Sequence, residues 1–513
     1  MACFSNLGGR RVPKAEPRLA PRDRLLERNP IGRRVVFGLA RRRVREETKG
    51  DYPAPLSAID VVERTAGAGA DEAYRIESEA LGELLVGDVS RALVRVFLLG
   101  QAAKKALPED ILSLARPVEV AAVIGAGVMG GAIAELAVAN DVRTLLKDID
   151  REALEAGQRH AADLLRKAAK ARVFTQEEAG LKLALLTGTL AYDGFGEVDL
   201  AIEAVVERMA VKQQVFRELE GVVRPETVLA TNTSSLSVTE MGTALGRPER
   251  LVGLHFFNPV HRMPLVEVIR AERTGEAALA TAFRFALDTG KTPVVVADSP
   301  GFLVNRLLGP YLAEAGRLIE EGVPIEAIDR ALVAFGMPMG PCRLLDEIGF
   351  DVARHAGREM AAAFGDRLAP SGVLDRLIEE GRLGKKNGRG FYRYEDGRSK
   401  GVDPEVGAAV PSGTRELPDE RIRSRCLWSM VNEAARALEE EVVASADLLD
   451  LAMIMGTGFP PFRGGLLRWA DGQGLAKIHE GLTGLAGELG ERFRPAPLLT
   501  RLAEQNGTFT HSP

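Results

Sequence analysis

The chain has 513 residues, enough for about three domains, and its 46% apolar and 27% charged residues are typical of a globular protein. The net charge of −5 provides no positive field for binding nucleic acid. No apolar run reaches the roughly 20 residues that a helix needs to cross a bilayer, so we do not expect a transmembrane protein.

The three cysteines, Cys3, Cys342 and Cys426, lie far apart and lack metal-ligand spacing, so we expect no metal site. They indicate a reducing compartment, and we expect a cytoplasmic, bacterial-type protein. The arginine-rich, acid-poor start of the chain leaves a mitochondrial transit peptide as the alternative. We favour a basic surface linker there, because prolines and the Arg41-Arg42-Arg43 run interrupt any amphipathic helix.

Residues 1–117 show no strand pattern, and we predict an N-terminal linker segment followed by helices. Prolines punctuate the start, and Tyr52-Pro53-Ala54-Pro55 marks a second break. Apolar residues recur at helical spacing between Asp71 and Lys105.

In residues 118–297, short apolar runs alternate with helical stretches, which predicts a parallel sheet covered on both faces. The fold class is therefore α/β, with a Rossmann-like domain over this range. The predicted strands are 120–124, 144–146, 200–204, 228–231, 251–255, 265–269 and 293–296. The predicted helices lie near 129–139, 151–172 and 209–220.

From residue 298 onward the pattern is mostly helical and contains an internal repeat. Glu314, the run Glu320-Glu321-Gly322-Val323 and Asp329 recur in the same order as Glu433, Glu439-Glu440-Glu441-Val442 and Asp450. We predict two repeated all-α C-terminal domains, 298–395 and 418–513. The glycine- and proline-rich stretch 396–417 connects them.

The segment Gly125-Ala126-Gly127-Val128-Met129-Gly130 has the pattern G-x-G-x-x-G between a predicted strand and a predicted helix. Gly125 permits a tight turn, Gly127 lets the backbone approach a pyrophosphate, and Gly130 lets helix and strand pack closely. The start of the helix offers free N–H groups and a positive dipole end to phosphates. This segment predicts a dinucleotide site.

Asp148 follows at the end of the next strand, where a carboxylate can accept hydrogen bonds from both ribose hydroxyls of NAD. It would repel the 2′-phosphate of NADP, so we predict NAD as the cofactor. Asp150 is a nearby competitor for this role.

His255 ends one predicted strand and Glu267 lies inside the next, and the short connection between them requires an antiparallel pair. The two positions are symmetric about His261, so a hairpin centred there sets the two side chains opposite each other. An imidazole can abstract a proton at neutral pH, and a carboxylate on its other nitrogen fixes the tautomer. We predict a catalytic base held by a carboxylate.

The segment from His255 to Glu267, together with Asn232-Thr233-Ser234-Ser235-Leu236 and residues 298–306, resembles the L-3-hydroxyacyl-CoA dehydrogenases of fatty-acid β-oxidation. The resemblance covers about residues 118–500. The duplicated C-terminal half is similar to the dehydrogenase part of the multifunctional β-oxidation α-subunits. It implies NAD-dependent oxidation of (3S)-3-hydroxyacyl-CoA.

The resemblance also implies a role for individual residues. His255 is the general base and Glu267 its orienting partner, while Ser234 and Asn258 lie beside the substrate oxygen and the nicotinamide. Asn305 lines the substrate site. The residues implied to contact the cofactor are Val128, Met129, Asp148, Val205, Val206, Glu207, Lys212 and Lys386, with Lys212 also near coenzyme A.

The sequence departs from those relatives in two places. Too few residues precede the first predicted strand for a hydratase domain, so we expect no hydration of enoyl thioesters. Met455 stands where the relatives often carry a tyrosine near the substrate, which leaves the acyl-chain preference open. We expect a homodimer or a complex with a thiolase or hydratase partner.

Two other functions remain open from the sequence. One is a dehydrogenase of free β-hydroxyacids, which would use a catalytic lysine. The other is a catalytically idle or dehydrogenase-only subunit of a multienzyme complex. Activity of the wild type against a His255→Ala variant separates an enzyme from an idle subunit.

Overall fold

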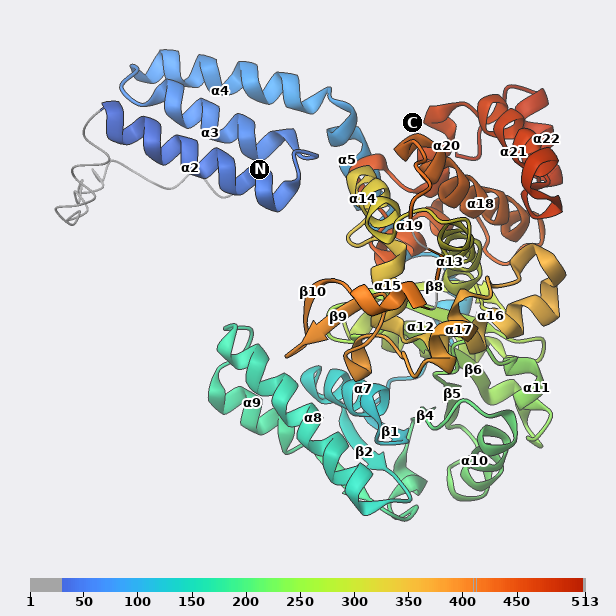
Figure 1. Cartoon of the computed structure of the whole chain (residues 1–513). Helices are drawn as coiled ribbons and strands as arrows, with labels where there is room; N and C mark the ends of the chain where they lie inside the picture. Colours follow the sequence, from blue (N-terminus) through green and yellow to red (C-terminus); the bar gives the residue numbers. More distant parts are fainter. Residues whose placement is uncertain (1–29, 409, 412, 511–513) are drawn as a thin grey trace, which may run out of the picture. The chain divides into compact units, whose positions relative to one another are not determined.

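The structure, a computed structural model, describes residues 30–408, 410–411 and 413–510 (Figure 1). The chain divides into two compact units, Met1–Arg91 and Ala92–Pro513. Within the described residues, no helix combines the length and the apolar character that crossing a bilayer requires.

The first unit contains α2 (Pro30–Thr48), α3 (Pro53–Thr65) and α4 (Ala70–Leu85). The prediction of a surface linker is wrong for α2, because arginine favours helices and two of its arginines pair with glutamates one turn later. These pairs are Arg42–Glu46 at 2.8 Å and Arg43–Glu47 at 3.0 Å. The predicted break at residues 52–55 is confirmed by the start of α3.

An eight-stranded sheet forms the centre of the second unit, in the order β3-β2-β1-β4-β5-β6-β7-β8. All neighbours are parallel except β6 and β7, which are antiparallel as predicted. The strands are β1 (Val120–Ile124), β2 (Arg143–Lys147), β3 (Leu186–Thr189), β4 (Leu200–Glu203), β5 (Val228–Thr231), β6 (Leu251–Phe256), β7 (Leu265–Arg270) and β8 (Thr292–Ala297). The first six follow the order of a doubly wound nucleotide-binding sheet.

Helices cover both faces of this sheet because alternate strand residues pack in opposite directions. Val123 of β1 packs in one apolar cluster with α7 and α12, while Ala122 and Ile124 pack in the other with α10 and α11. The helices are α7 (Val128–Ala139), α8 (Arg151–Lys170), α9 (Gln176–Leu183), α10 (Met209–Val222), α11 (Val238–Gly242) and α12 (Glu276–Asp288). Of these elements the sequence patterns missed β3, α9, α11 and α12.

Two helical repeats follow the sheet, as predicted. The first contains α13 (Val304–Glu320), α14 (Ile325–Phe335), α15 (Pro341–Ile348), α16 (Phe350–Phe364) and α17 (Val373–Glu379). The second contains α18 (Asp419–Glu439), α19 (Ala446–Thr457), α20 (Leu466–Gln473), α21 (Leu475–Leu489) and α22 (Pro497–Glu504). A hairpin of β9 (Tyr392–Glu395) and β10 (Arg398–Val402) lies between them. The long helices α13 and α18 pack side by side (Figure 1).

The second repeat also contacts the sheet and a helix from the N-terminal part of the chain. Ala297, at the end of β8, donates its N–H to Val442 O at 2.9 Å. Arg95, on α5 (Asp88–Ala103), pairs with Asp447 at 2.5 Å and with the buried Asp450 at 3.1 Å. The end of the N-terminal segment is therefore part of the packing of the second repeat.

Candidate active site

The glycine turn joins β1 to α7 at the carboxyl end of the sheet. Gly125 has φ of +100°, and a Cβ there would lie 2.6 Å from Ala204 O. A Cβ on Gly130 would lie 1.8 Å from Gly125 O, so both positions require glycine. Open space surrounds Gly127, and Val128 at the start of α7 is 66% exposed. The turn therefore presents the free N–H groups of a helix start to solvent, which suits a pyrophosphate.

Asp148 lies directly after β2 and beside this turn. Its Oδ2 accepts the N–H of Ala126 at 2.7 Å, and its Oδ1 accepts the N–H of Ile149 at 2.7 Å. The competitor Asp150 caps α8 instead, accepting the N–H groups of Glu152 and Ala153. The carboxylate nearest the glycine turn is therefore that of Asp148, which supports its predicted ribose role.

The hairpin of β6 and β7 brings His255 and Glu267 together. The two residues are partners in the strand register, and His255 Nδ1 lies 2.7 Å from Glu267 Oε2. Both side chains are buried, and the imidazole packs against the rings of Phe257 and Phe302. The predicted opposition of these two side chains is confirmed.

The start of α13 holds the second oxygen of Glu267. Oε1 accepts the N–H groups of Leu303 at 3.1 Å and Val304 at 2.9 Å. These are free donors of the first turn, where the helix dipole also favours an anion. Both oxygens of the carboxylate are thus fixed, one by the imidazole and one by the helix.

Ser234 lies after β5 and is bonded on both sides. Glu207 Oε1 accepts its N–H at 2.9 Å and its hydroxyl at 3.3 Å, and also accepts the hydroxyl of Thr233. Asn305 Nδ2 donates to Ser234 O at 3.1 Å, which joins α13 to the same loop. Burial alone raises the pKa of Glu207, but Lys212 and these donors bring the pKa below its usual value. Glu207 is therefore an anionic anchor for the Ser234 loop.

Lys212 requires a correction. We expected it to lie near coenzyme A, but its side chain is 1% exposed. Its ammonium group donates to Glu203 Oε1 at 2.8 Å and pairs with Glu207 Oε2 at 3.1 Å. An ammonium group buried between two carboxylates is not available to phosphates at the surface. Through Glu207, Lys212 braces the Ser234 loop instead.

The remaining predicted residues lie around this centre or beyond it. Asn258 is exposed in the turn after β6, and Met455 is half-buried on α19. Lys386 is exposed on the short helix η4 (Lys385–Asn387), where its ammonium group bonds Asp351 Oδ2 at 2.6 Å. Among the predicted cofactor contacts, Met129 and Val205 are half-buried and Val206 is exposed.

Two residues at this centre were missed as site residues by sequence reasoning. Asn232 Oδ1 accepts the N–H of Phe256 at 2.8 Å and so fixes the strand end that carries His255. Glu203 is fully buried at the end of β4, where it holds Lys212 and the hydroxyl of Thr231. The sequence did offer a signal for Glu203, because a glutamate inside an otherwise apolar strand is rarely buried without a specific partner.

Comparison with known families identifies both halves of the second unit. The model described as "3-hydroxyacyl-CoA dehydrogenase, NAD binding domain" matches residues 120–299. The model described as "3-hydroxyacyl-CoA dehydrogenase, C-terminal domain" matches twice, at residues 301–394 and 422–511. The chain belongs to the 3-hydroxyacyl-CoA dehydrogenase family. The double match also confirms the predicted internal repeat.

Relatives and solved structures agree with this family. A "Fatty acid oxidation complex subunit alpha" from Acinetobacter baumannii is 41% identical over 492 residues, covering 94% of this chain and 68% of the relative. A 3-hydroxybutyryl-CoA dehydrogenase from Escherichia coli superposes with a TM-score of 0.67 at 31% identity, covering 76% of this chain and 99% of that chain. The dehydrogenase part of multifunctional enzyme 1 from C. elegans gives a TM-score of 0.57 at 28% identity, covering 80% and 96%.

This 3-hydroxyacyl-CoA dehydrogenase is an NAD-dependent oxidoreductase. The glycine turn fits the dinucleotide. Gly125 and Gly130 let the turn fold tightly, and the space beside Gly127 is open, so a pyrophosphate can approach the backbone there. Acyl-CoA thioesters are the substrate class of the family.

Proposed function

We propose that this enzyme oxidises (3S)-3-hydroxyacyl-CoA to 3-oxoacyl-CoA, with His255 as the general base and Glu267 as its orienting partner. The observation that carries this proposal is the contact of 2.7 Å between Nδ1 and Oε2 of these buried side chains. It lies at the carboxyl end of the sheet that also carries the glycine turn, where ligands of such sheets bind.

The residues would hold the cofactor as follows. The glycine turn and the start of α7, including Met129, receive the pyrophosphate, and Asp148 receives the ribose hydroxyls. Val205 and Val206 offer backbone groups, and Lys386 is proposed to reach the dinucleotide by leaving Asp351. When bound, NAD supplies the hydride acceptor for the substrate carbon that bears the hydroxyl.

The chain's own residues manage the proton. Nδ1 of His255 donates to Glu267, so Nε2 is the nitrogen that accepts the substrate hydroxyl proton. The carboxylate stabilises the imidazolium that forms, and its second oxygen stays fixed by the start of α13. Ser234, Asn258 and Asn305 are proposed to position the substrate oxygen.

We place this reaction in fatty-acid β-oxidation. The name of the Acinetobacter baumannii relative, a subunit of a fatty acid oxidation complex, supports this assignment and a role in a complex. We propose a thiolase or hydratase as the partner, with a homodimer as the alternative. Met455, beside Gly456, is proposed to contact the acyl chain. A Cβ on Gly456 would lie 2.7 Å from Leu265 Cδ2, so α19 packs closely on the hairpin strand that contains Glu267.

The test is NADH formation by the purified wild type and by His255→Ala. We expect turnover of 3-hydroxybutyryl-CoA by the wild type, little turnover of free 3-hydroxybutyrate, and almost none of either substrate by the variant. Equal use of the free acid would favour a β-hydroxyacid dehydrogenase. An inactive wild type would favour an idle subunit.

A further inference from the structure

The two helical repeats exchange charged partners in a reciprocal way. Arg306, Glu314 and Glu321 of the first repeat correspond, at equal spacing, to Arg425, Glu433 and Glu440 of the second. Among the described residues, the ion pairs of Arg306 and Arg425 all join one repeat to the other. The same reciprocal pairing occurs at the interface of a two-fold symmetric dimer, but here it joins two repeats of a single chain.

The first set, which we call the near cluster, consists of Arg306, Glu433 and Glu440. Arg306 Nε pairs with Glu433 Oε1 at 2.7 Å, and its Nη1 pairs with Glu440 Oε2 at 2.7 Å. Arg306 is fully buried, with its guanidinium over the ring of Phe364. Three further groups face this cluster. They are Ser299, which bonds Arg306, and Arg367 and Arg436, which lie by Glu433.

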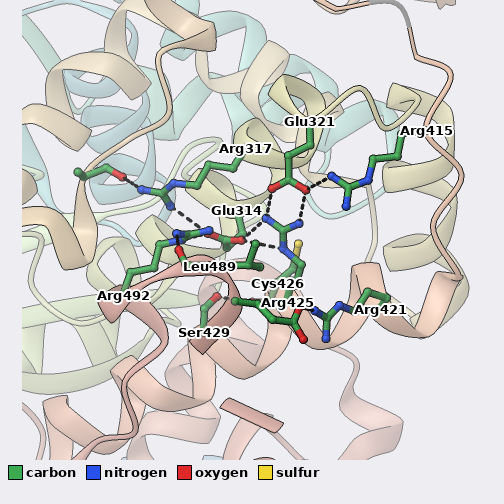
Figure 2. Close-up of polar contacts among 12 residues, drawn as sticks. Glu314, Arg317, Glu321, Arg415, Arg421, Arg425, Cys426, Ser429, Leu489 and Arg492 are labelled. Carbon is green, nitrogen blue, oxygen red and sulfur yellow. Dashed lines mark hydrogen bonds and ion pairs between the residues drawn. The ribbon is translucent and has the colours of Figure 1, made fainter. Parts of the chain in front are cut away.

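The second set, which we call the far cluster, consists of Arg425, Glu314 and Glu321 (Figure 2). Arg425 Nη2 lies 2.9 Å from Glu314 Oε2 and 2.7 Å from Glu321 Oε1. Figure 2 shows that Arg317 and Arg492 also converge on Glu314. The two clusters therefore match in residue types and in the burial of the arginine and of the inner glutamate, Glu433 or Glu314. The outer glutamates differ, since Glu440 is 45% exposed and Glu321 23%.

Only the near cluster adjoins the active site. Arg306 lies in the first turn of α13, next to Asn305 and two residues after Val304. The N–H of Val304 holds Glu267, and the amide of Asn305 holds the Ser234 loop. Arg425 lies further along its helix, which begins at Asp419. Its side-chain partners are Glu314 and Glu321, and neither of them bonds Glu267 or the Ser234 loop in the described residues.

We propose that Glu433 and Glu440 of the second repeat are positioning residues for the His255–Glu267 pair. They fix Arg306, and Arg306 fixes the turn whose N–H groups hold Glu267. A planar guanidinium held by two carboxylates keeps one orientation, and a buried arginine that loses a partner moves to find another. The second repeat, which contains neither His255 nor Glu267, thus helps to set the alignment of this pair on the β6–β7 hairpin. This inference rests on the proposed roles of His255 and Glu267.

The experiment compares Glu433→Gln with its counterpart Glu314→Gln in the full-length enzyme. Each change removes one buried charge from one of the matched clusters. For Glu433→Gln we expect kcat to fall by roughly 10- to 100-fold with little change in the KM for NAD. We also expect a larger primary deuterium isotope effect at carbon 3, because misalignment makes the chemical step limiting. Glu314→Gln should lose as much thermal stability while keeping the wild-type isotope effect.

If Glu433→Gln does not fold, Glu440→Gln replaces it, since Glu440 is 45% exposed. A smaller change in the same direction is expected from that variant. The inference is overturned if the near-cluster variants keep the wild-type kcat and isotope effect, or if Glu314→Gln reproduces their defects. Full activity of His255→Ala would instead refute the proposed function, whatever Glu433→Gln does.

Discussion

Replacing Glu267 by glutamine tests the tautomer on which the proposed mechanism depends. Oε1 accepts two backbone N–H groups, from Leu303 and Val304, so the amide oxygen of the variant must occupy that position. The amide nitrogen then faces His255 Nδ1 in place of the oxygen now at 2.7 Å. An amide N–H donates, so Nδ1 must become the acceptor and the ring proton must move to Nε2. The variant therefore presents the wrong nitrogen to the substrate.

The expected loss follows from this exchange of roles. A base held in the wrong tautomer costs roughly 10³- to 10⁴-fold in kcat, or about 4 to 5.5 kcal/mol of barrier. The assay is the rate of NADH formation from 3-hydroxybutyryl-CoA, with NAD affinity measured in parallel and expected to stay unchanged. Glu135→Gln is the matched control, because it also changes a buried glutamate and lies outside the proposed catalytic pair. A loss below tenfold in Glu267→Gln would refute the tautomer argument.

Three further changes have defined outcomes. In Gly130→Ala the new Cβ would lie 1.8 Å from Gly125 O, so the turn must shift. The affinity for NAD, measured by titration, should fall by at least about tenfold, or 1.4 kcal/mol. An affinity equal to that of the wild type would contradict this prediction. In Asp148→Arg the preference in steady-state kinetics should move from NAD toward NADP, and an unchanged preference would remove Asp148 from the ribose site. Burial raises the pKa of Glu135 from 4.5 to about 7, against the opposing effect of Lys291. Between pH 4.5 and 7 the folded protein therefore binds more protons than the unfolded protein, and it loses stability as the pH rises. Melting temperatures should therefore favour Glu135→Gln increasingly from pH 4.5 to 7, and a constant difference would contradict the raised pKa.

The sequence predicted the elements whose signals are local. Residue spacing was enough to predict the glycine turn, the strands around it and the β6–β7 hairpin. The register of His255 with Glu267 could be predicted because the connection between their strands is short and the two positions are symmetric about His261. The edge strand β3 was missed because its Leu-Thr-Gly-Thr sequence carries little apolar pattern. Helix α2 was missed because its regular pattern is one of arginine–glutamate pairs along an exposed surface, and the prediction looked for apolar residues at helical spacing.

Contacts between distant segments could not be predicted from the sequence in the same way. In the sequence, Lys212 is a single charged residue on a predicted helix. Its contact with Glu203 forms only when the sheet has folded. Arg306 and Glu433 lie in different repeats, so neither spacing nor periodicity joins them. The repeat itself was visible, but the exchange of partners between its copies depends on how α13 and α18 pack.

The most direct test of the account is a single-turnover measurement of NADH formation by His255→Gln, with enzyme saturated by NAD and in excess over 3-hydroxybutyryl-CoA. Removal of the base should slow this step by several orders of magnitude while both ligands still bind. A single-turnover rate close to that of the wild type would contradict the assignment of proton abstraction to His255.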